Sequence, residues 1–379
     1  MKILIITNIP NPYRIPLFNE LNILLGEKGM QFKVIFAAQT YSRRKFVLDL
    51  NDCKFDYAFL GSEQLSFGNT EKTTFRYGNL TEVLTTEKPD RIIVSGFSIA
   101  TMKVWWYTRR KKAQFLIWSG SVTTKGKGAG LIRTMQRRFL AAYSAAFVVY
   151  GKRARNYLES LGVPSKKIFK AINTVDTDFF SQKTAELKEK TVLSDNKHRL
   201  SYVGYLSERK NVGQLLQCIR LLASERTDFI LDLIGDGDAK ADLQRQVREL
   251  KLDDFVRFPG FKQKHELPEY YASTDVFLFQ TGFDIWGLVL NEAMAAGLPC
   301  IASPNAGAVD DLILDGETGY VIDFNDEKSI VQKINYLFDH KDQAKRIGNN
   351  GAAFIKENAS VKQSAEGFVK AILSSFRSS

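Results

Sequence analysis

Residues 281–297 read TGFDIWGLVLNEAMAAG and directly follow a short apolar run, Val276–Phe279. The apolar run predicts a buried strand, and the Leu-, Met- and Ala-rich stretch after Gly287 predicts a helix. A strand, a loop and a helix in this order leave free backbone N–H groups near Gly287 and Leu288, where a helix N-terminus attracts phosphate. The segment therefore predicts an anion-binding turn in an α/β fold.

Two carboxylates flank this turn, because Asp284 lies in the loop before the predicted helix and Glu292 lies in its second turn. Carboxylates around an anion site suit a ligand that carries both hydroxyls and a pyrophosphate, and a nucleotide sugar is such a ligand. We assign the intervening Ile285 and Trp286 to the same site. The alternative interpretation is an amphipathic helix whose Glu292 is merely solvated.

The rest of the chain falls into two halves, and each half alternates short apolar runs with longer helical patterns. This alternation is typical of doubly wound parallel sheets. The predicted fold class is α/β, with two Rossmann-like domains at residues 1–181 and 198–357 and a polar linker at 182–197. Ligands of such domains bind at the carboxyl ends of the strands, which favours a site facing the space between them. The expected strands are Lys2–Asn8, Phe32–Ala38, Arg91–Val94, Gln114–Trp118, Ala146–Val149, Ile168–Ala171, Leu200–Gly204, Phe229–Ile234, Val256–Phe258, Val276–Phe279 and Pro299–Ala302.

Charge is distributed unevenly along the 379 residues. Residues 1–180 hold 28 Lys and Arg against 13 Asp and Glu, whereas the whole chain has a net charge of only +11. Within residues 91–158 there are 14 basic side chains and no acidic one, interleaved with aromatic and apolar residues. This pattern suits the surface of an anionic membrane. The alternative is that the aromatics belong to the core and the cations only solvate the outer face.

The 281–297 segment resembles the donor-binding signature of the retaining glycosyltransferases of family 4 (glycosyl transferases group 1), which place two acidic residues around a glycine-rich turn. The first acid is usually Glu in that family and is Asp284 here. The resemblance implies the GT-B architecture, in which two domains face each other across a cleft. It also implies that the last helix, within residues 358–379, crosses back to the first domain.

A second motif carries the resemblance to residues 205–210, YLSERK. Relatives have an Arg followed five residues later by a Lys, and both cations grip the donor diphosphate. Lys210 matches the Lys, whereas Tyr205 stands at the Arg position. The resemblance therefore implies catalytic roles for Asp284, Lys210 and Glu292, and a donor contact for Tyr205.

Shorter motifs complete the donor site that the resemblance implies. Gly235-Asp236-Gly237 follows a predicted strand, where the backbone would approach the nucleotide, and Phe261 lies in the loop that would meet the nucleobase. Read alone, these two motifs are ordinary turns.

On the acceptor side, the family resemblance points to the stiff loop after the first strand and to the end of another strand. The expected acceptor-side residues are Asn8, Pro12, Tyr13, Arg14 and Ser119.

The implied function is retaining, metal-independent transfer of a sugar from a nucleotide-sugar donor to a glycan acceptor, expected to be lipid-linked, in surface polysaccharide biosynthesis. The expected location is cytoplasmic and peripheral on the inner face of the cell membrane, through residues 91–158. No cofactor or metal is expected, because no His/Cys/Asp cluster has ligand spacing, and no nucleic-acid module is recognised.

Three other functions were weighed. A catalytically degenerate nucleotide-sugar-binding or scaffolding protein at the membrane is the main alternative, because Tyr205 and Asp284 depart from the family pattern. An epimerase on the same fold is disfavoured by the lack of its catalytic histidines and carboxylates. A dehydrogenase is disfavoured because the loop after the first strand lacks the glycine fingerprint.

Overall fold

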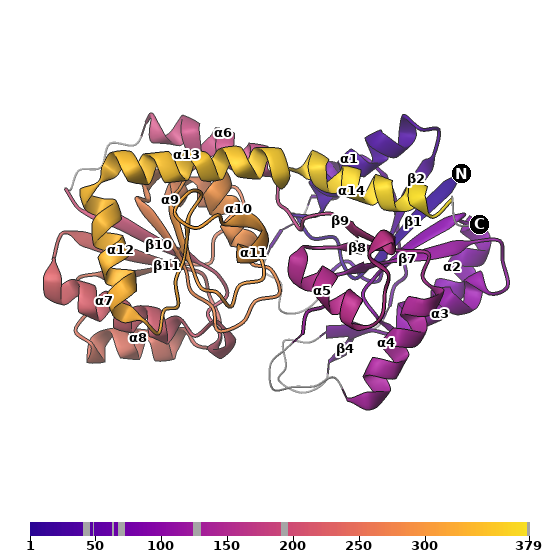
Figure 1. The fold of residues 1–379 in the computed structure, drawn as a ribbon, viewed down its shortest axis with the longest axis horizontal. Coiled ribbons are helices and arrows are strands. Elements are labelled where there is room, and N and C mark those ends of the chain that lie inside the picture. Colours follow the sequence, from indigo (N-terminus) through magenta and orange to yellow (C-terminus); the bar gives the residue numbers. More distant parts are fainter. Residues whose placement is uncertain are drawn as a thin grey trace. The chain divides into compact units, whose positions relative to one another are not determined.

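The computed structural model describes residues 1–40, 46–47, 49–62, 64–66, 73–123, 130–190 and 196–376. The described chain divides into two compact units, Met1–Asn173 with Val361–Ser379, and Thr174–Ser360. The two doubly wound α/β domains expected from the sequence are thereby confirmed, and each is built on its own parallel sheet (Figure 1).

The sheet of the first unit has the strand order β3-β2-β1-β6-β7-β8-β9, and all of its paired strands are parallel. The central strands consist almost entirely of buried apolar residues, as expected when helices cover both faces of a sheet. Chain order reverses between β1 and β6, which is the topological switch point of this sheet. The strands are β1 (Lys2–Thr7), β2 (Gln31–Phe36), β3 (Asp56–Phe59), β6 (Arg91–Ser95), β7 (Gln114–Ser119), β8 (Ala146–Val149) and β9 (Ile168–Lys170), and a separate hairpin contains β4 (Gln64–Ser66) and β5 (Thr73–Phe75).

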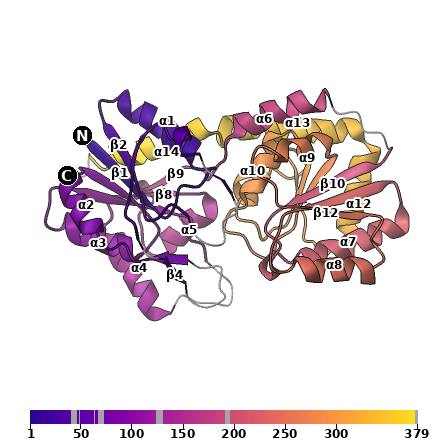
Figure 2. The same cartoon turned by 180° about the vertical axis from the view of Figure 1, so that it is seen from behind.

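Helices cover both faces of this sheet (Figure 2). Side chains of α1 (Ile15–Gly26) and α14 (Val361–Ser374) form one apolar layer with Ile3 and Ile5 of β1. The opposite layer, which includes Leu4 and Ile6 of β1, is covered by α2 (Leu80–Glu87), α3 (Ile99–Thr108), α4 (Leu131–Tyr143) and α5 (Lys152–Ser160). The last helix thus belongs to the first unit, where Gly367 allows it to approach the carbonyl of Lys170.

The second unit contains a parallel sheet of order β12-β11-β10-β13-β14-β15, whose switch point lies between β10 and β13. Its strands are β10 (His198–Val203), β11 (Phe229–Ile234), β12 (Val256–Gly260), β13 (Val276–Phe279), β14 (Cys300–Ala302) and β15 (Tyr320–Val321). One group of helices is α7 (Val212–Glu225), α8 (Lys240–Glu249) and α12 (Glu327–Asp339), and the other is α6 (Thr177–Lys188), α9 (Leu267–Ser273), α10 (Leu288–Ala295), α11 (Val309–Leu312) and α13 (Lys341–Asn358). Figure 1 shows these two groups on opposite sides of the sheet.

The boundary between the units differs from the one expected. The chain divides after Asn173, not after residue 181, and the expected linker 182–197 begins inside helix α6. The carboxylate of Asp176 caps this helix by accepting a hydrogen bond from the N–H of Phe179 at 3.2 Å. The polar composition of residues 182–188 is therefore that of a solvated helical face, and residues 191–195 lie outside the described residues. The expected second-domain range 198–357 lies wholly within the second unit, which also includes α6.

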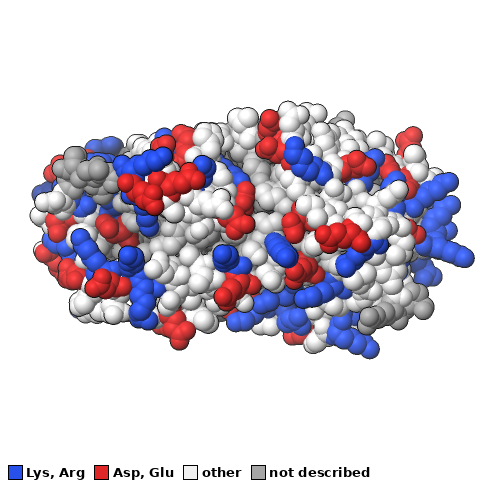
Figure 3. Space-filling model, turned by 90° about the horizontal axis from the view of Figure 1, so that it is seen from above, with Lys and Arg blue, Asp and Glu red and all other residues white. Residues whose placement is uncertain are grey.

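Basic side chains gather on the first unit, whereas both signs are mixed over the second (Figure 3). The basic stretch 91–158 spans β6 to α5, except for residues 124–129, which are outside the part of the chain that the structure describes. Its aromatic residues divide between core and surface: Trp118 is buried, while half of Trp106 is exposed. Among the described residues, no helix combines the length and apolarity needed to cross a membrane.

Candidate functional site

The switch point of the second sheet brings two loops together that are far apart in the sequence. Strands β10 and β13 are parallel neighbours, with Leu200 beside Val276 and Ser201 beside Phe277. The loop after β10 carries Lys210, and the loop after β13 carries Asp284. In an open α/β sheet, ligands usually bind at the carboxyl ends of the strands on either side of the switch point.

Lys210 and Asp284 form an ion pair at this position. The Lys210 ammonium donates to Oδ2 of Asp284, and its side chain is only 9% exposed against 20% for the aspartate. The same ammonium lies 5.5 Å from the centroid of the Phe279 ring, at the end of β13. The loop around the aspartate is also held by its backbone, since Asp284 N–H donates to Asn305 O at 3.1 Å and Gly307 N–H donates to Asp284 O at 3.0 Å.

Helix α10 begins beside this ion pair. Gly287 precedes its first residue with φ +102, a conformation that side chains rarely adopt, and a Cβ there would lie 2.4 Å from the Phe279 ring. Only glycine therefore allows the chain to turn so tightly over β13. Leu290 N–H donates to Gly287 O at 2.9 Å, whereas the N–H groups of Leu288 and Val289 have no acceptor within the helix and provide positive partial charge near Lys210 and Asp284.

Trp286 stabilises the turn at Gly287 through two hydrogen bonds. Its indole Nε1 donates to Oδ1 of Asn291 at 2.9 Å, its backbone N–H donates to Oδ1 of Asp284 at 3.2 Å, and its side chain is buried. The neighbouring Ile285 is 45% exposed, so the two residues of the expected site differ in surroundings. Trp286 supports the turn, whereas Ile285 offers an apolar surface to a ligand.

Glu292 lies in the second turn of α10 and accepts a hydrogen bond from the buried Tyr271 hydroxyl at 2.9 Å. Removal of the carboxylate from water raises the pKa of Glu292 to about 7, against smaller lowering effects from the Tyr271 hydrogen bond and the Lys264 charge. Near neutral pH this carboxyl group therefore changes its protonation readily. Neither Tyr271 nor Asn291 was predicted, because nothing in the sequence pairs them with a residue of the turn.

The Gly235-Asp236-Gly237 turn after β11 passes very close to the loop after β10. A Cβ on Gly235, whose φ is +148, would lie 1.9 Å from the carbonyl oxygen of Gly204, and one on Gly237 would lie 2.2 Å from that of Leu206. The glycines are therefore required by close backbone approach. Asp236 accepts a hydrogen bond from Gly237 N–H at 3.0 Å, which shapes the turn.

Three side chains on loops at the carboxyl ends of the strands reach solvent or the turn before α10. Tyr205 is 39% exposed and donates through its hydroxyl to Oδ1 of Asp238 at 3.1 Å, and Phe261, after β12, is 42% exposed. Arg209 donates to the carbonyl oxygen of Phe283 beside Asp284. A guanidinium is thus present near the turn, although it comes from position 209 and not from 205.

At the switch point of the first sheet, Arg14 is the best-anchored of the expected acceptor-side residues. Its guanidinium lies 4.3 Å from the centroid of the Trp118 ring, donates to Thr7 Oγ1 at 2.8 Å and donates to the Tyr150 hydroxyl at 3.0 Å. Tyr13 lies along the same guanidinium, 5.5 Å from ring centroid to Cζ. These contacts join the carboxyl ends of β1, β7 and β8.

The other expected residues of this unit lie in different surroundings. Asn8 is exposed and accepts from the Tyr77 hydroxyl at 2.7 Å, while Pro12 is half-buried. Ser119 is fully buried, and its hydroxyl oxygen accepts from the N–H of Ser121 at 3.1 Å. Asn8 and Pro12 are accessible, whereas Ser119 lies inside the domain. In the described part of both units, no group of three or more His, Cys, Asp or Glu residues is arranged to hold a metal ion.

Comparison with known families identifies the second half of the chain. A family model described as Glycosyl transferases group 1 matches residues 183–354, the range that contains Lys210, the 235–237 turn, Asp284 and Glu292. Residues 183–354 form a Glycosyl transferases group 1 domain. The expected resemblance to glycosyl transferases group 1 is therefore confirmed for this domain.

Curated relatives match over about half of their own length. N-acetyl-alpha-D-glucosaminyl L-malate synthase from Bacillus anthracis is 27% identical over 203 residues, which cover 53% of this chain and 52% of that protein. The GDP-mannose-dependent alpha-(1-6)-phosphatidylinositol monomannoside mannosyltransferase of Mycolicibacterium smegmatis is 30% identical over 194 residues, 48% of this chain and 50% of that protein. The capsular polysaccharide biosynthesis glycosyltransferase CapM of Staphylococcus aureus is 28% identical over 185 residues, 48% of each chain.

Solved structures extend the likeness to the whole fold. HepE from Anabaena, in complex with UDP, superposes with a TM-score of 0.78 at 16% identity and covers 99% of this chain and 100% of that one. Sucrose-phosphate synthase from Thermosynechococcus elongatus gives a TM-score of 0.75 at 17% identity and covers 100% of both chains. At these identities the likeness establishes the fold, which is that of GT-B glycosyltransferases.

Proposed function

We propose that this chain is a retaining, metal-independent glycosyltransferase that moves a sugar from a nucleotide-sugar donor to a hydroxyl of a glycan acceptor. The observation that carries the proposal is the position of Lys210, Asp284 and the start of α10 together at the switch point of the Glycosyl transferases group 1 domain. The functions of two relatives, capsular polysaccharide biosynthesis and GDP-mannose-dependent mannosyl transfer, support it.

In this proposal the donor diphosphate lies between Lys210 and the first N–H groups of α10. The hard step is cleavage of the bond between the anomeric carbon and the diphosphate oxygen, because negative charge builds on the departing diphosphate. A cation and a helix N-terminus that are already oriented stabilise that charge without reorganisation. Lys210 is well suited to this role because its ammonium is held in place by Asp284 and by the Phe279 ring.

The remaining donor contacts follow from position. Asp284, which pairs with Lys210, would also hold hydroxyls of the transferred sugar. Glu292 would hold the ribose hydroxyls. The nucleoside would lie along the 235–237 turn and the exposed ring of Phe261, with Tyr205, Ile285 and Gly287 near the sugar and diphosphate.

The acceptor hydroxyl would attack the anomeric carbon on the face that the diphosphate leaves. Its oxygen forms the new glycosidic bond, the old carbon–oxygen bond breaks, and the departing phosphate accepts the hydroxyl proton. This route requires neither a protein base nor a metal. We place the acceptor along the first unit at Asn8, Pro12, Tyr13 and Arg14, with Ser119 beneath them.

The proposal includes a membrane-bound, lipid-linked acceptor. It also places the protein on the cytoplasmic face of the cell membrane, as a peripheral protein. Helix α4 supports it, because Leu131 and Ile132 are 77% and 85% exposed and Met135 is 62% exposed. The exposed Arg133 and Arg138 lie on the same helix, and α4 contains no acidic residue. Exposed apolar residues flanked by cations fit the interface of an anionic bilayer.

Donor binding tests the proposal directly. Thermal stabilisation by UDP-, GDP-, dTDP- and ADP-sugars would be measured on the wild type, on Lys210→Ala and on Lys356→Ala, an exposed lysine of α13 that serves as a control. We expect one nucleotide to stabilise the wild type and the control variant but not Lys210→Ala. The absence of any shift with all four donors at about 1 mM, a generous concentration for a substrate, would contradict the proposal.

Turnover separates a transferase from the alternative scaffold. The donor that binds would be incubated with lipid-linked glycan acceptors, and the anomeric configuration of the product would be read by NMR. Retained configuration is expected. Binding without turnover across the acceptors, unchanged by Tyr205→Arg, would favour a degenerate binding protein.

A further inference from the structure

A cavity lies in the second unit, at the amino ends of the strands of its sheet. It has a volume of about 570 Å³ and is lined by residues at the amino ends of strands: His198 at the start of β10, Asp275 just before β13 and Leu298 just before β14. Because all strands of this sheet are parallel, Lys210 and Asp284 lie at the other edge. The cavity is therefore separate from the proposed donor site.

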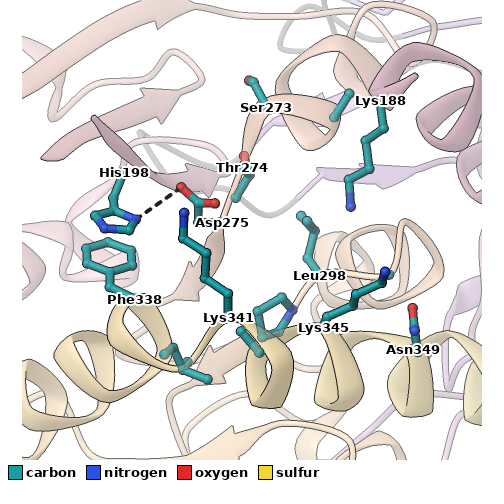
Figure 4. Close-up of a pocket in the computed structure, with 15 residues that line it drawn as sticks. Lys188, His198, Ser273, Thr274, Asp275, Leu298, Phe338, Lys341, Lys345 and Asn349 are labelled. Atoms are coloured by element: carbon teal, nitrogen blue, oxygen red, sulfur yellow. Dashed lines mark ion pairs between the residues drawn. The ribbon is translucent and has the colours of Figure 1, made fainter. Parts of the chain in front are cut away.

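Three lysines line this cavity, one from α6 and two from α13. Figure 4 shows that Lys188 and Lys341 extend into the space between the helices from opposite sides, with Lys345 one turn further along α13. Asp275 is the one acidic residue among those that line it. The lining thus carries an excess of positive charge.

Asp275 is already engaged and does not neutralise the lysines fully. Its Oδ2 accepts a hydrogen bond from the N–H of Arg199 at 2.8 Å and lies 3.7 Å from Nδ1 of His198. Partial removal from water lowers the pKa of Lys188, Asp275 opposes this and the charge of Lys345 adds to it, while the Lys188 side chain remains exposed. The repulsion between Lys188 and Lys345 costs free energy that a bound anion would offset.

The floor of the cavity is rigid. The ring of His198 stacks on Phe338 with centroids 4.1 Å apart and an angle of 7° between the planes. Next to it, the buried Thr274 hydroxyl lies 3.0 Å from that of Ser201 and donates to Tyr270 O at 2.7 Å. The cavity combines apolar surface with three exposed lysines, and its volume is usual for small-molecule sites.

We propose that this cavity binds a small phosphate-bearing molecule, held by Lys188, Lys341 and Lys345. Phosphate suits three ammonium groups because it offers several oxygens to separate donors. The volume leaves room for an organic part of the size of a sugar or a nucleoside beside Leu298. This site goes beyond the proposed function and does not depend on it.

Inorganic pyrophosphate is the probe for this site, and it would be titrated by calorimetry into the full chain. Lys210→Ala is the background, because it removes the proposed donor contact for the same anion. On that background, a Lys188→Gln/Lys341→Gln/Lys345→Gln variant is compared with Lys356→Gln, which removes an exposed charge from α13 outside the cavity. We expect the triple variant to bind pyrophosphate at least about tenfold more weakly than the control. Equal affinities in the two variants would overturn the proposal, whatever the result at Lys210.

A second measurement uses the wild type and does not depend on how the variants fold. Lysine acetylation would be followed by mass spectrometry with and without pyrophosphate. We expect slower acetylation of Lys188, Lys341 and Lys345 in its presence, with no change at Lys356. Protection confined to Lys210 would mean that the anion binds only at the donor site and would overturn the proposal.

Discussion

The ammonium group of Lys210 and the carboxylate of Asp284 form an ion pair across 74 residues of sequence. Each comes from a different loop at the carboxyl ends of two neighbouring strands, and both side chains are largely withdrawn from water. The pair joins these loops and positions a cation next to the N-terminus of α10. In the proposed function, the lysine that pairs with Asp284 is also the contact for the donor diphosphate.

The first prediction concerns the strength of this pair. Asp284→Ala leaves the ammonium of the buried Lys210 without its carboxylate, and should lower the free energy of unfolding by about 3 kcal/mol. A double-mutant cycle with Lys210→Ala, read by urea unfolding, should give a clear coupling energy. The exposed pair Lys183 and Glu186 on α6 is the matched control, and its cycle should give no measurable coupling. Equal coupling in both cycles would contradict this account of Lys210 and Asp284.

The second prediction concerns the glycine before α10. Gly287→Ala places a Cβ against the Phe279 ring in an unfavourable backbone conformation, and should destabilise the protein by about 2–3 kcal/mol. It should also weaken donor binding, because the first turn of α10 must shift. Gly297→Ala is the control: its φ of +74 is also unfavourable, but nothing lies within 4 Å of the new Cβ. Calorimetric titration should show unchanged donor affinity in Gly297→Ala, and a loss as large as in Gly287→Ala would count against a specific role for the turn.

The third prediction concerns pH. The pKa of Glu292 is raised from 4.5 to about 7 in the folded protein, so folding takes up a proton between these values. This contribution to stability is complete below pH 4.5 and is lost as the pH rises to 7. Relative to Glu292→Gln, the wild type should therefore lose about 2–3 kcal/mol across this range. Urea unfolding at several pH values measures the difference, and parallel stability curves for the two proteins would show that the pKa is not raised.

The fourth prediction concerns helix α4. Ile132 is 85% exposed, so Ile132→Glu should leave the melting temperature unchanged. Binding to anionic lipid vesicles in sedimentation assays should fall by about tenfold or more, since an apolar anchor is replaced by a like charge to the lipid. Ile23→Glu changes an exposed isoleucine on α1 and should bind vesicles as the wild type does. If Ile132→Glu also binds normally, α4 is not the membrane contact.

The fifth prediction concerns the tyrosine at the position of the family's arginine. Tyr205→Arg would place a permanent cation on the loop that also carries Lys210, and we expect it to increase the affinity for the donor by about tenfold. Tyr205→Phe removes only the hydroxyl that bonds Asp238, and should change donor affinity little. Titration calorimetry with the preferred nucleotide sugar measures both variants. A weaker complex with Tyr205→Arg would show that Tyr205 does not lie beside the diphosphate.

Much of the fold was predictable from local pattern. The expected strands Ala146–Val149, Phe229–Ile234 and Val276–Phe279 have the observed bounds, because a buried parallel strand is a continuous apolar run that ends where polar residues begin. Helix α6 was missed, since a polar segment with few large apolar residues is equally typical of a linker. Its capping by Asp176 and its packing on the second unit are what make it helical.

The candidate site was predictable only in its local parts. The turn at Gly287, the acid before it and the helix after it lie within one short segment, so their residue types and spacing predict an anion site. Strand order, by contrast, depends on which apolar faces pack together, and no short window of sequence encodes it. The neighbouring positions of β10 and β13 therefore decide that Lys210 meets Asp284.

What the sequence by itself determined here is most of the strands of the two parallel sheets, the α/β class and the strand, turn and helix around Gly287, because each depends on the preferences of neighbouring residues. Tertiary structure alone decided the Lys210–Asp284 pair, the Tyr271 hydroxyl on Glu292, the setting of Arg14 among three aromatic rings and the lysine-lined cavity. Each of these joins residues from separate elements. Their chemistry arises from burial and distance, which exist only once the sheets have formed and their helices have packed.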